Sequence, residues 1–154
     1  MFRMHLGLKQ EKLTAPYVNS ILEYEPIKQL RTAEIEKIYA VFIKKIGFEY
    51  TPLLAVEFGS GNEFRLFEET YKPEDIIGAN KKIQSDGIVI VHNHPRHLNR
   101  MVKAYPSKGD IKCTIDCGEN WQENGCILLD HIIINEIQYY SFYENGLIKH
   151  SLYN

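Results

Sequence analysis

The sequence predicts a single domain of the α/β or α+β class, in which helices flank a central mixed β-sheet. Its length of 154 residues and its hydrophobic content of 44% suit one compact domain with its own core. Segments with helical periodicity and segments rich in β-branched residues follow one another without a repeat or a linker. The run GIVIV at residues 87–91 is continuously apolar, as expected of a strand that is covered on both faces.

The N-terminal part of the chain is predicted to be an extension of this domain. Residues 1–30 form short mixed segments that Pro16 and Pro26 interrupt, so we expect them to pack on a domain that spans residues 31–154. The first clear element is TAEIEKIYAVFIKKIG at residues 32–47. Its apolar side chains recur at helical spacing, namely Ile35, Ile38, Tyr39, Phe42, Ile43 and Ile46. We therefore predict a helix that packs one face against the core.

A hairpin and a second helix are expected next. EYTPLLAVEF at residues 49–58 and EFRLFEETY at residues 63–71 are rich in strand-forming residues, and the glycines of GSGN between them suit a tight turn. PEDIIGANKKIQ at residues 73–84 begins with proline, which is favoured at the first position of a helix, and carries isoleucines at roughly helical intervals.

The remaining elements complete the predicted sheet. The turn SDG leads into a strand over residues 87–94, and Pro95 ends it. DIKCTIDCGENWQ at residues 110–122 is predicted to be a helix. CILLDHIII and IQYYSFYENG, with a turn at Asn135 and Glu136 between them, are predicted to form an alternating hairpin.

Composition excludes several classes of protein. The apolar runs are too short to span a membrane, and MFRMHLGLKQEK lacks the apolar segment of a signal peptide, so we expect a cytoplasmic protein. The formal net charge is −2, whereas a nucleic-acid binder usually has a basic surplus, so direct nucleic-acid binding is not expected. Cys113, Cys117 and Cys126 form no paired CxxC spacing and are predicted to be free thiols.

A candidate metal site follows the predicted strand 87–94. His92 and His94 are two residues apart, so their side chains point to the same face at the carboxyl end of the strand, where open sheets commonly bind ligands. Asp110 lies at the start of the next predicted helix and suits a third ligand of Zn²⁺. Three protein ligands leave a fourth position for water, whose pKa falls to about 7 on zinc.

The residues of the candidate metal site allow other interpretations. Half-buried histidines at a strand end, without a metal, would also explain His92 and His94. Ser107 and Asp110 also fit a helix cap, a role that is compatible with metal binding. His131 suits either a packed strand residue or a partner that orients a ligand. An HNH nuclease would spread its three residues over a ββα unit, and a deaminase would need HxE and PCxxC, which this chain does not have.

The blocks HNHP, PSKGD, LLDHIII and YYSFYENGLI resemble the JAB/MPN (JAMM) metalloprotease family, and within it the RadC-like branch. The resemblance covers about residues 45–148 and includes Thr114, which follows Asp110 at the family's interval. It implies a JAB-like fold, with zinc held by His92, His94 and Asp110. It also implies that Ser107 lies near the oxyanion. An upstream glutamate would act as general base, and the register favours Glu49 over Glu57 for that role.

One departure from the family pattern lies beside the site. The segment 95–106 between His94 and Ser107 is longer than in the usual pattern, and Arg96 and His97 replace the usual SG. The longer segment adds Arg96, Arg100 and Lys103, which suit either a substrate-facing loop or a solvated one.

The resemblance implies a zinc-dependent metallohydrolase that cleaves peptide or isopeptide bonds through metal-activated water. Its substrate would be a protein or a peptide, and the wider family suggests a ubiquitin-like conjugate. Two alternatives remain at this point: a non-catalytic interaction module with the same fold, and a RadC-like protein associated with DNA repair or mobile elements.

Overall fold

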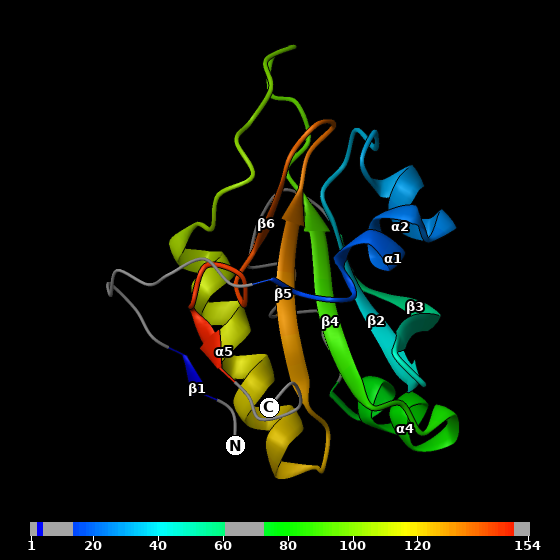
Figure 1. Ribbon diagram of the computed structural model, residues 1–154. Coiled ribbons are helices and arrows are strands. Elements are labelled where there is room, and N and C mark those ends of the chain that lie inside the picture. The colour runs from blue at the N-terminus through cyan, green and yellow to red at the C-terminus, as the bar shows by residue number, and fades with distance from the viewer. Residues whose placement is uncertain (1–2, 5–13, 61–72, 150–154) are drawn as a thin grey trace.

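A computed structural model describes residues 3–4, 14–60 and 73–149, and its main feature is a five-stranded sheet with the strand order β3-β2-β4-β5-β6 (Figure 1). The strands of this sheet are β2 (Lys37–Ile46), β3 (Glu49–Ser60), β4 (Gly87–Asn93), β5 (Leu128–Ile134) and β6 (Tyr139–Ser141). The helices are α1 (Val18–Glu23), α2 (Glu25–Leu30), α4 (Pro73–Ile83) and α5 (Lys108–Glu123). Two short strands, β1 (Arg3–Met4) and β7 (Ile148–Lys149), form a separate antiparallel pair.

The sheet is mixed, as the sequence predicted. β4 and β5 run parallel and are joined through α5, whereas β2 is antiparallel to both β3 and β4. Every residue of β4 and of β5 is buried, which explains why these two strands are continuously apolar over most of their length. The predicted strand 87–94, the helices at 73–84 and 110–122 and the β5–β6 hairpin are confirmed.

Residues 32–47 are not helical, and this prediction was wrong. The segment contains a loop followed by β2, of which Ala40, Val41, Phe42 and Ile43 are all buried. A strand that is covered on both faces is apolar at consecutive positions, so some of its apolar residues also fall at helical intervals. The β-branched and aromatic residues of IYAVFI favour a strand, and their packing decides the structure.

The strand that begins at residue 49 pairs with a different strand from the one expected. β3 pairs in antiparallel register with β2, and the chain reverses between them at Gly47, whose φ of 63° suits glycine. The predicted second strand at residues 63–71 lies outside the described residues.

Helices cover both faces of the sheet. On one face, α1 and α2 pack against alternate residues of β2 and β4 and bury Tyr17, Ile21 and Ile27 completely. On the other face, α4 and α5 pack against Phe42, Ile88 and Ile90, with Trp121 fully buried among them. Within the described ranges, no helix is both long and apolar enough to cross a lipid bilayer.

Candidate metal centre

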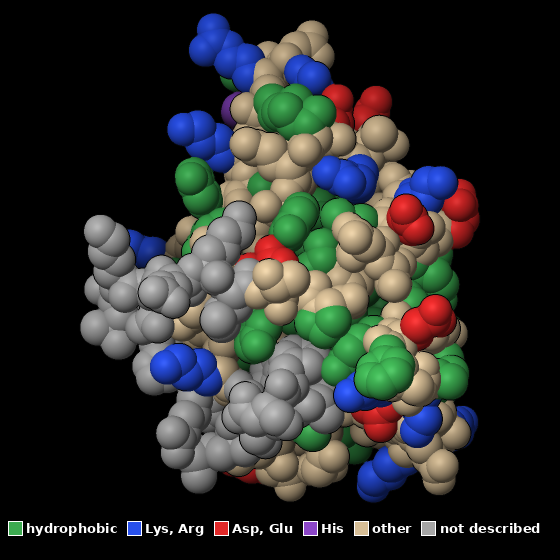
Figure 2. Space-filling model, viewed as in Figure 1, with side chains coloured by type: hydrophobic (Ala, Val, Ile, Leu, Met, Phe, Trp, Pro, Cys, Tyr) green, Lys and Arg blue, Asp and Glu red, His purple; other side chains and the backbone are tan. Residues whose placement is uncertain are grey.

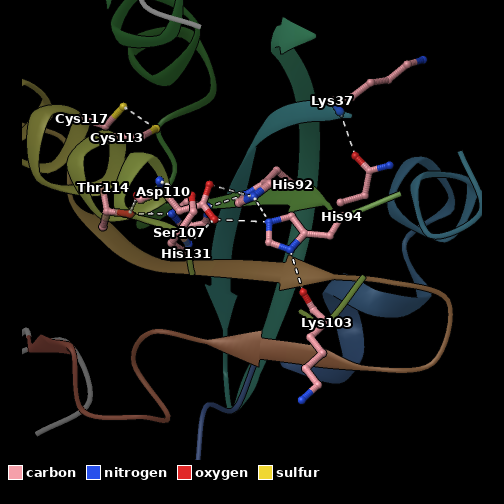
Figure 3. A network of polar contacts seen from close by, with 11 residues as sticks. Lys37, His92, His94, Lys103, Ser107, Asp110, Cys113, Thr114, Cys117 and His131 are labelled. Carbon is pink, nitrogen blue, oxygen red and sulfur yellow. Dashed lines mark hydrogen bonds and ion pairs between the residues drawn. The ribbon is translucent and has the colours of Figure 1, made fainter. Parts of the chain in front are cut away.

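The end of β4 directs polar side chains to both faces of the sheet. His92 and His94 point toward the N-terminus of α5, where Asp110 lies (Figure 3). Asn93 points the other way and binds the segment that leads into β2. Its side-chain oxygen accepts a hydrogen bond from the backbone N–H of Lys37 at 2.8 Å, and its amide donates to the carbonyls of Ile35 at 3.1 Å and Ala33 at 3.4 Å. Asn93 therefore fixes residues 33–37 beside the two histidines.

Asp110 is positioned by the cap of α5. The Ser107 hydroxyl accepts from the backbone N–H of Asp110 at 3.1 Å, and the Asp110 carboxylate accepts from the backbone N–H of Ser107 at 2.9 Å. This reciprocal pair is a capping box, and it holds the carboxylate at the first turn of the helix. The predicted roles of these residues as helix cap and as candidate ligand are thus compatible.

Three side chains converge on one point. The Nε2 atoms of His92 and His94 are 3.1 Å apart, His92 Nε2 lies 3.2 Å from Asp110 Oδ1, and His94 Nε2 lies 3.3 Å from Asp110 Oδ2. Ligands about 2.0–2.1 Å from a tetrahedral ion are separated by about 3.3–3.4 Å, so this spacing is close to that of a zinc coordination sphere. His92 and Asp110 are buried, and His94 is half-buried.

The hydrogen bond of His94 fixes its tautomer. His94 Nδ1 lies 2.8 Å from the backbone carbonyl of Lys103, and a carbonyl can only accept a hydrogen bond. Nδ1 therefore carries a proton, and in the neutral ring Nε2 presents its lone pair to Asp110.

A chain of three hydrogen bonds fixes His92 in the same way. The Thr114 hydroxyl donates to the backbone carbonyl of Asp110 at 2.7 Å, so it accepts from His131 Nδ1 at 2.6 Å. His131 Nε2 is then an acceptor, and His92 Nδ1 donates to it at 2.7 Å. The sequence predicted His131 as either packed or orienting, and the structure shows it fully enclosed and bonded to His92. Burial holds the pKa of His131 well below its ordinary value, so its ring is neutral.

The result is a centre made of hydrogen-bond acceptors. With Nδ1 of both histidines protonated, two lone pairs and a carboxylate face one another in a buried place, an arrangement that a cation would stabilise. Two imidazoles and one carboxylate are a donor set that fits zinc.

The centre opens into a cleft of about 490 Å³ that Glu36 also lines. Glu36 is half-buried and belongs to the segment that Asn93 holds. Burial raises the pKa of Glu36 above its ordinary value. Sequence reasoning missed Glu36 because it placed this residue inside a helix. Its position directly before the apolar run of β2 was the signal that could have identified it.

The structure does not bring Glu49 to this cleft. Glu49 pairs with Ile46, whereas the metal centre lies at the other end of β2, where Ile38 pairs with His92. Ile38 and Ile46 are eight residues apart, or roughly 26 Å at about 3.3 Å per residue. Glu57, the second choice, is exposed on β3, opposite Tyr39. The glutamates that line the cleft are instead Glu34 and Glu36.

The segment 95–106 forms one wall of the cleft and projects beyond the sheet (Figure 1). His97 and Arg100 exchange two backbone hydrogen bonds around Leu98 and Asn99, whose φ values of 51° and 62° make a tight turn. Lys and Arg side chains gather with hydrophobic ones at the projecting end (Figure 2).

The three basic residues predicted for a substrate loop lie in different positions. Arg96 lines the cleft and makes a two-pronged ion pair with Glu136, at 2.5 and 3.3 Å. Arg100 and Lys103 are exposed, and Lys103 contributes its carbonyl to the site. A substrate role for the three residues stays a prediction.

Comparison with known proteins identifies the family to which the chain belongs. The family model of the RadC-like JAB domain matches residues 64–147. A UPF0758 protein of Fusobacterium nucleatum is 27% identical over 93% of this chain and 53% of its own length. UPF0758 proteins of Aquifex aeolicus and Staphylococcus carnosus are 36% and 39% identical over 50% and 48% of this chain, respectively, and over 31% and 30% of their own lengths.

The chain therefore spans about half the length of the Fusobacterium relative and about a third of the other two. The match to the family model includes HNHP, PSKGD and LLDHIII, the blocks that supply His92, His94, Asp110 and His131. With its mixed sheet, its flanking helices and a histidine–histidine–aspartate cluster that fits a JAB metal site, the chain belongs to the RadC-like branch of the JAB/MPN family.

Proposed function

We propose that this protein is a zinc-dependent hydrolase of amide bonds, either peptide bonds or isopeptide bonds in a ubiquitin-like conjugate. The observation that carries the proposal is the convergence of three acceptor groups, the Nε2 atoms of His92 and His94 and the carboxylate of Asp110, with contacts of 3.1–3.3 Å between them. When bound there, zinc would polarise a substrate carbonyl and lower the pKa of a water molecule to about 7.

Glu36 is the proposed general base. It lines the cleft next to the metal ligands, and the hydrogen bonds of Asn93 hold the backbone of the segment to which it belongs. A carboxylate in this position would take a proton from the attacking water and deliver it to the leaving amine. In this role Glu36 replaces Glu49, which begins β3 and pairs with the far end of β2.

Ser107 is the proposed donor to the oxyanion. Its hydroxyl oxygen lines the cleft and accepts from the backbone N–H of Asp110, and the hydroxyl proton has no acceptor among the described residues. The cap therefore uses a lone pair of Ser107 and leaves its proton available. A donor aimed at the developing negative charge of a tetrahedral intermediate stabilises the transition state.

The test is a comparison of three glutamate variants. Glu36→Gln should retain zinc and the fold, because glutamine keeps the shape of the side chain and Glu36 is not a ligand in this assignment. Hydrolysis of peptide and isopeptide-linked substrates should fall by roughly 10²–10⁴, the usual effect of removing a positioned base. Glu49→Gln and Glu57→Gln are matched controls that should retain activity. Full activity in Glu36→Gln would refute the assignment of the base.

The wild-type protein tests the wider proposal. Zinc binding without cleavage across a broad panel of peptides and isopeptide-linked conjugates would favour a non-catalytic interaction module instead. Because the chain spans only part of its relatives, the substrates and partners of a longer protein would be further proposals.

A further inference from the structure

We propose that Glu34 is a specificity-determining residue that binds a cationic side chain of the substrate, a lysine or an arginine close to the bond that is cleaved. The inference rests on the proposed hydrolase function and deepens it by naming the charge of the substrate.

Most charged groups in the cleft already have partners. His92, His94 and Asp110 face one another across the metal centre. Arg96, which also lines the cleft, is held by both oxygens of Glu136 and donates to the carbonyl of Asn99 at 3.1 Å. Arg96 is therefore poorly placed to bind a negative charge on the substrate.

Glu34 differs from these residues. It lines the same cleft, it is exposed, and it makes no hydrogen bond or ion pair with any of the described residues. Glu36, two positions later, adds a second carboxyl group to this wall. Glu34 therefore carries a negative charge that no side chain in the described part of the protein pairs with.

The backbone around Glu34 is held in place. The Asn93 amide donates to the carbonyls of Ala33 and Ile35, the residues on either side of Glu34, at 3.4 and 3.1 Å. Asn93 is also the residue between His92 and His94, so one side chain ties the position of Glu34 to the metal ligands. A carboxylate presented from a fixed backbone loses less entropy when it binds a partner than one on a mobile segment.

The negative charge of Glu34 affects substrate binding once a substrate fills the cleft. A substrate that lies against residues 34–36 removes water from the Glu34 carboxylate, which is costly unless a cation replaces the water. A lysine or arginine supplies that cation, a neutral side chain leaves the charge uncompensated, and an acidic side chain is repelled. The cleft should therefore select against acidic residues as well as for basic ones.

The experiment begins with a synthetic peptide library in which the positions around a cleaved amide bond are randomised one at a time. Wild-type protein loaded with zinc should favour lysine or arginine at one of these positions. Two peptides that differ only there, lysine against glutamate, should then differ about three- to tenfold in kcat/KM, mainly through KM, as expected of one partly screened charge pair. The preference should shrink as salt is added.

Charge-swap variants assign the preference to Glu34. Glu34→Lys should reverse the order of the two peptides, and Glu34→Gln, a milder change at an exposed position, should abolish the preference. Glu123→Lys changes an exposed charge at the end of α5, outside the cleft, and should keep the wild-type order. Zinc content and circular dichroism of each variant verify that the metal centre and the fold are intact.

The outcomes separate the two proposals. If the wild-type protein cleaves the lysine and glutamate peptides equally well, or if both Glu34 variants keep its preference, the role of Glu34 is refuted and the hydrolase proposal stands. If the wild-type protein cleaves no peptide and no isopeptide-linked substrate, the hydrolase proposal fails and the inference about Glu34 fails with it.

Discussion

Single residues set the protonation pattern of the metal centre. Thr114 has one hydroxyl proton, which it donates to the carbonyl of Asp110, and this donation decides which nitrogen of His131 carries a proton. His131 in turn decides the tautomer of His92. The lone pair that His92 directs to the centre thus depends on a hydroxyl that lies two hydrogen bonds away from it.

Replacing that hydroxyl should weaken metal binding. Thr114→Val keeps the shape of the side chain but removes the acceptor for His131 and the donor to Asp110, so His92 is no longer held in one tautomer. We expect zinc affinity to fall about 10–100-fold, the usual effect of losing a partner that orients a ligand. Competition with a chelating indicator measures this affinity. Thr114→Ser keeps the hydroxyl and should bind zinc nearly as the wild type does. Equal affinity in Thr114→Val and the wild type would contradict the orienting chain.

The candidate ligands were predictable from the sequence, and the cleft glutamates were not. His92 and His94 share a face because side chains alternate along a strand, and Asp110 follows a serine at the spacing of a helix cap. Both signals are local. Glu36 reaches the cleft only because Asn93 binds the preceding loop, and a contact between residues 93 and 35 has no local signature.

At the scale of elements, β2 and α5 show when a sequence pattern is enough to predict the secondary structure of a segment. The apolar residues of β2 fit both a helix and a doubly covered strand, and the decision comes from pairing with β3 and β4. The beginning of α5 is specified locally by the capping box of Ser107 and Asp110. Prediction succeeded where the signal lay in the element itself and failed where neighbouring strands supplied it.

The cap of α5 should contribute measurably to stability. Ser107→Ala removes the oxygen that accepts from the backbone N–H of Asp110, and the free energy of unfolding should fall by about 0.5–2 kcal/mol. Ser107→Thr keeps an acceptor at the cap and should lose less. Urea denaturation of the metal-free proteins isolates this effect from zinc binding. An unchanged midpoint in Ser107→Ala would show that the cap contributes little to stability.

At the scale of the whole molecule, buried carboxylates connect distant parts of the chain. Asp130 on β5 is fully buried and accepts hydrogen bonds from the hydroxyls of Tyr17 and Ser141 and from the backbone N–H groups of His131 and Tyr143. Glu144 accepts from the backbone N–H of Ala15 at 3.0 Å. Residues 15–17 are thereby tied to residues 141–144.

The two helices that these N-terminal residues form could not be predicted from the sequence. α1 and α2 have only six residues each, and isolated helices of that length are unstable in water. They form because Ile21 and Ile27 are buried against the sheet and because Tyr17 reaches Asp130. Fold class was predictable because the longer elements and the two-sided burial of β4 leave clear patterns.

Asp130 should make stability depend on pH. Burial raises its pKa from 3.8 to about 7, against four hydrogen bonds that favour the ionised form. The folded state therefore binds a proton more tightly than the unfolded state, so this contribution to stability is complete below about pH 4 and is lost as the pH rises toward about 7. Asp130→Asn cannot titrate. The free energy of unfolding of the metal-free wild type, relative to this variant, should fall between pH 4 and 7 in urea titrations. A constant difference would contradict the raised pKa.

The metal centre itself is tested most directly by the zinc content of the purified protein. Mass spectrometry of wild-type protein dialysed against zinc-containing and then metal-free buffer should find about one zinc ion per chain. The double variant His92→Ala, His94→Ala should retain none, because one carboxylate cannot hold the ion alone. His97→Ala, which removes a histidine of the cleft wall that is outside the cluster, should bind zinc as the wild type does. Wild-type protein without zinc, or unchanged zinc in the double variant, would contradict the central claim.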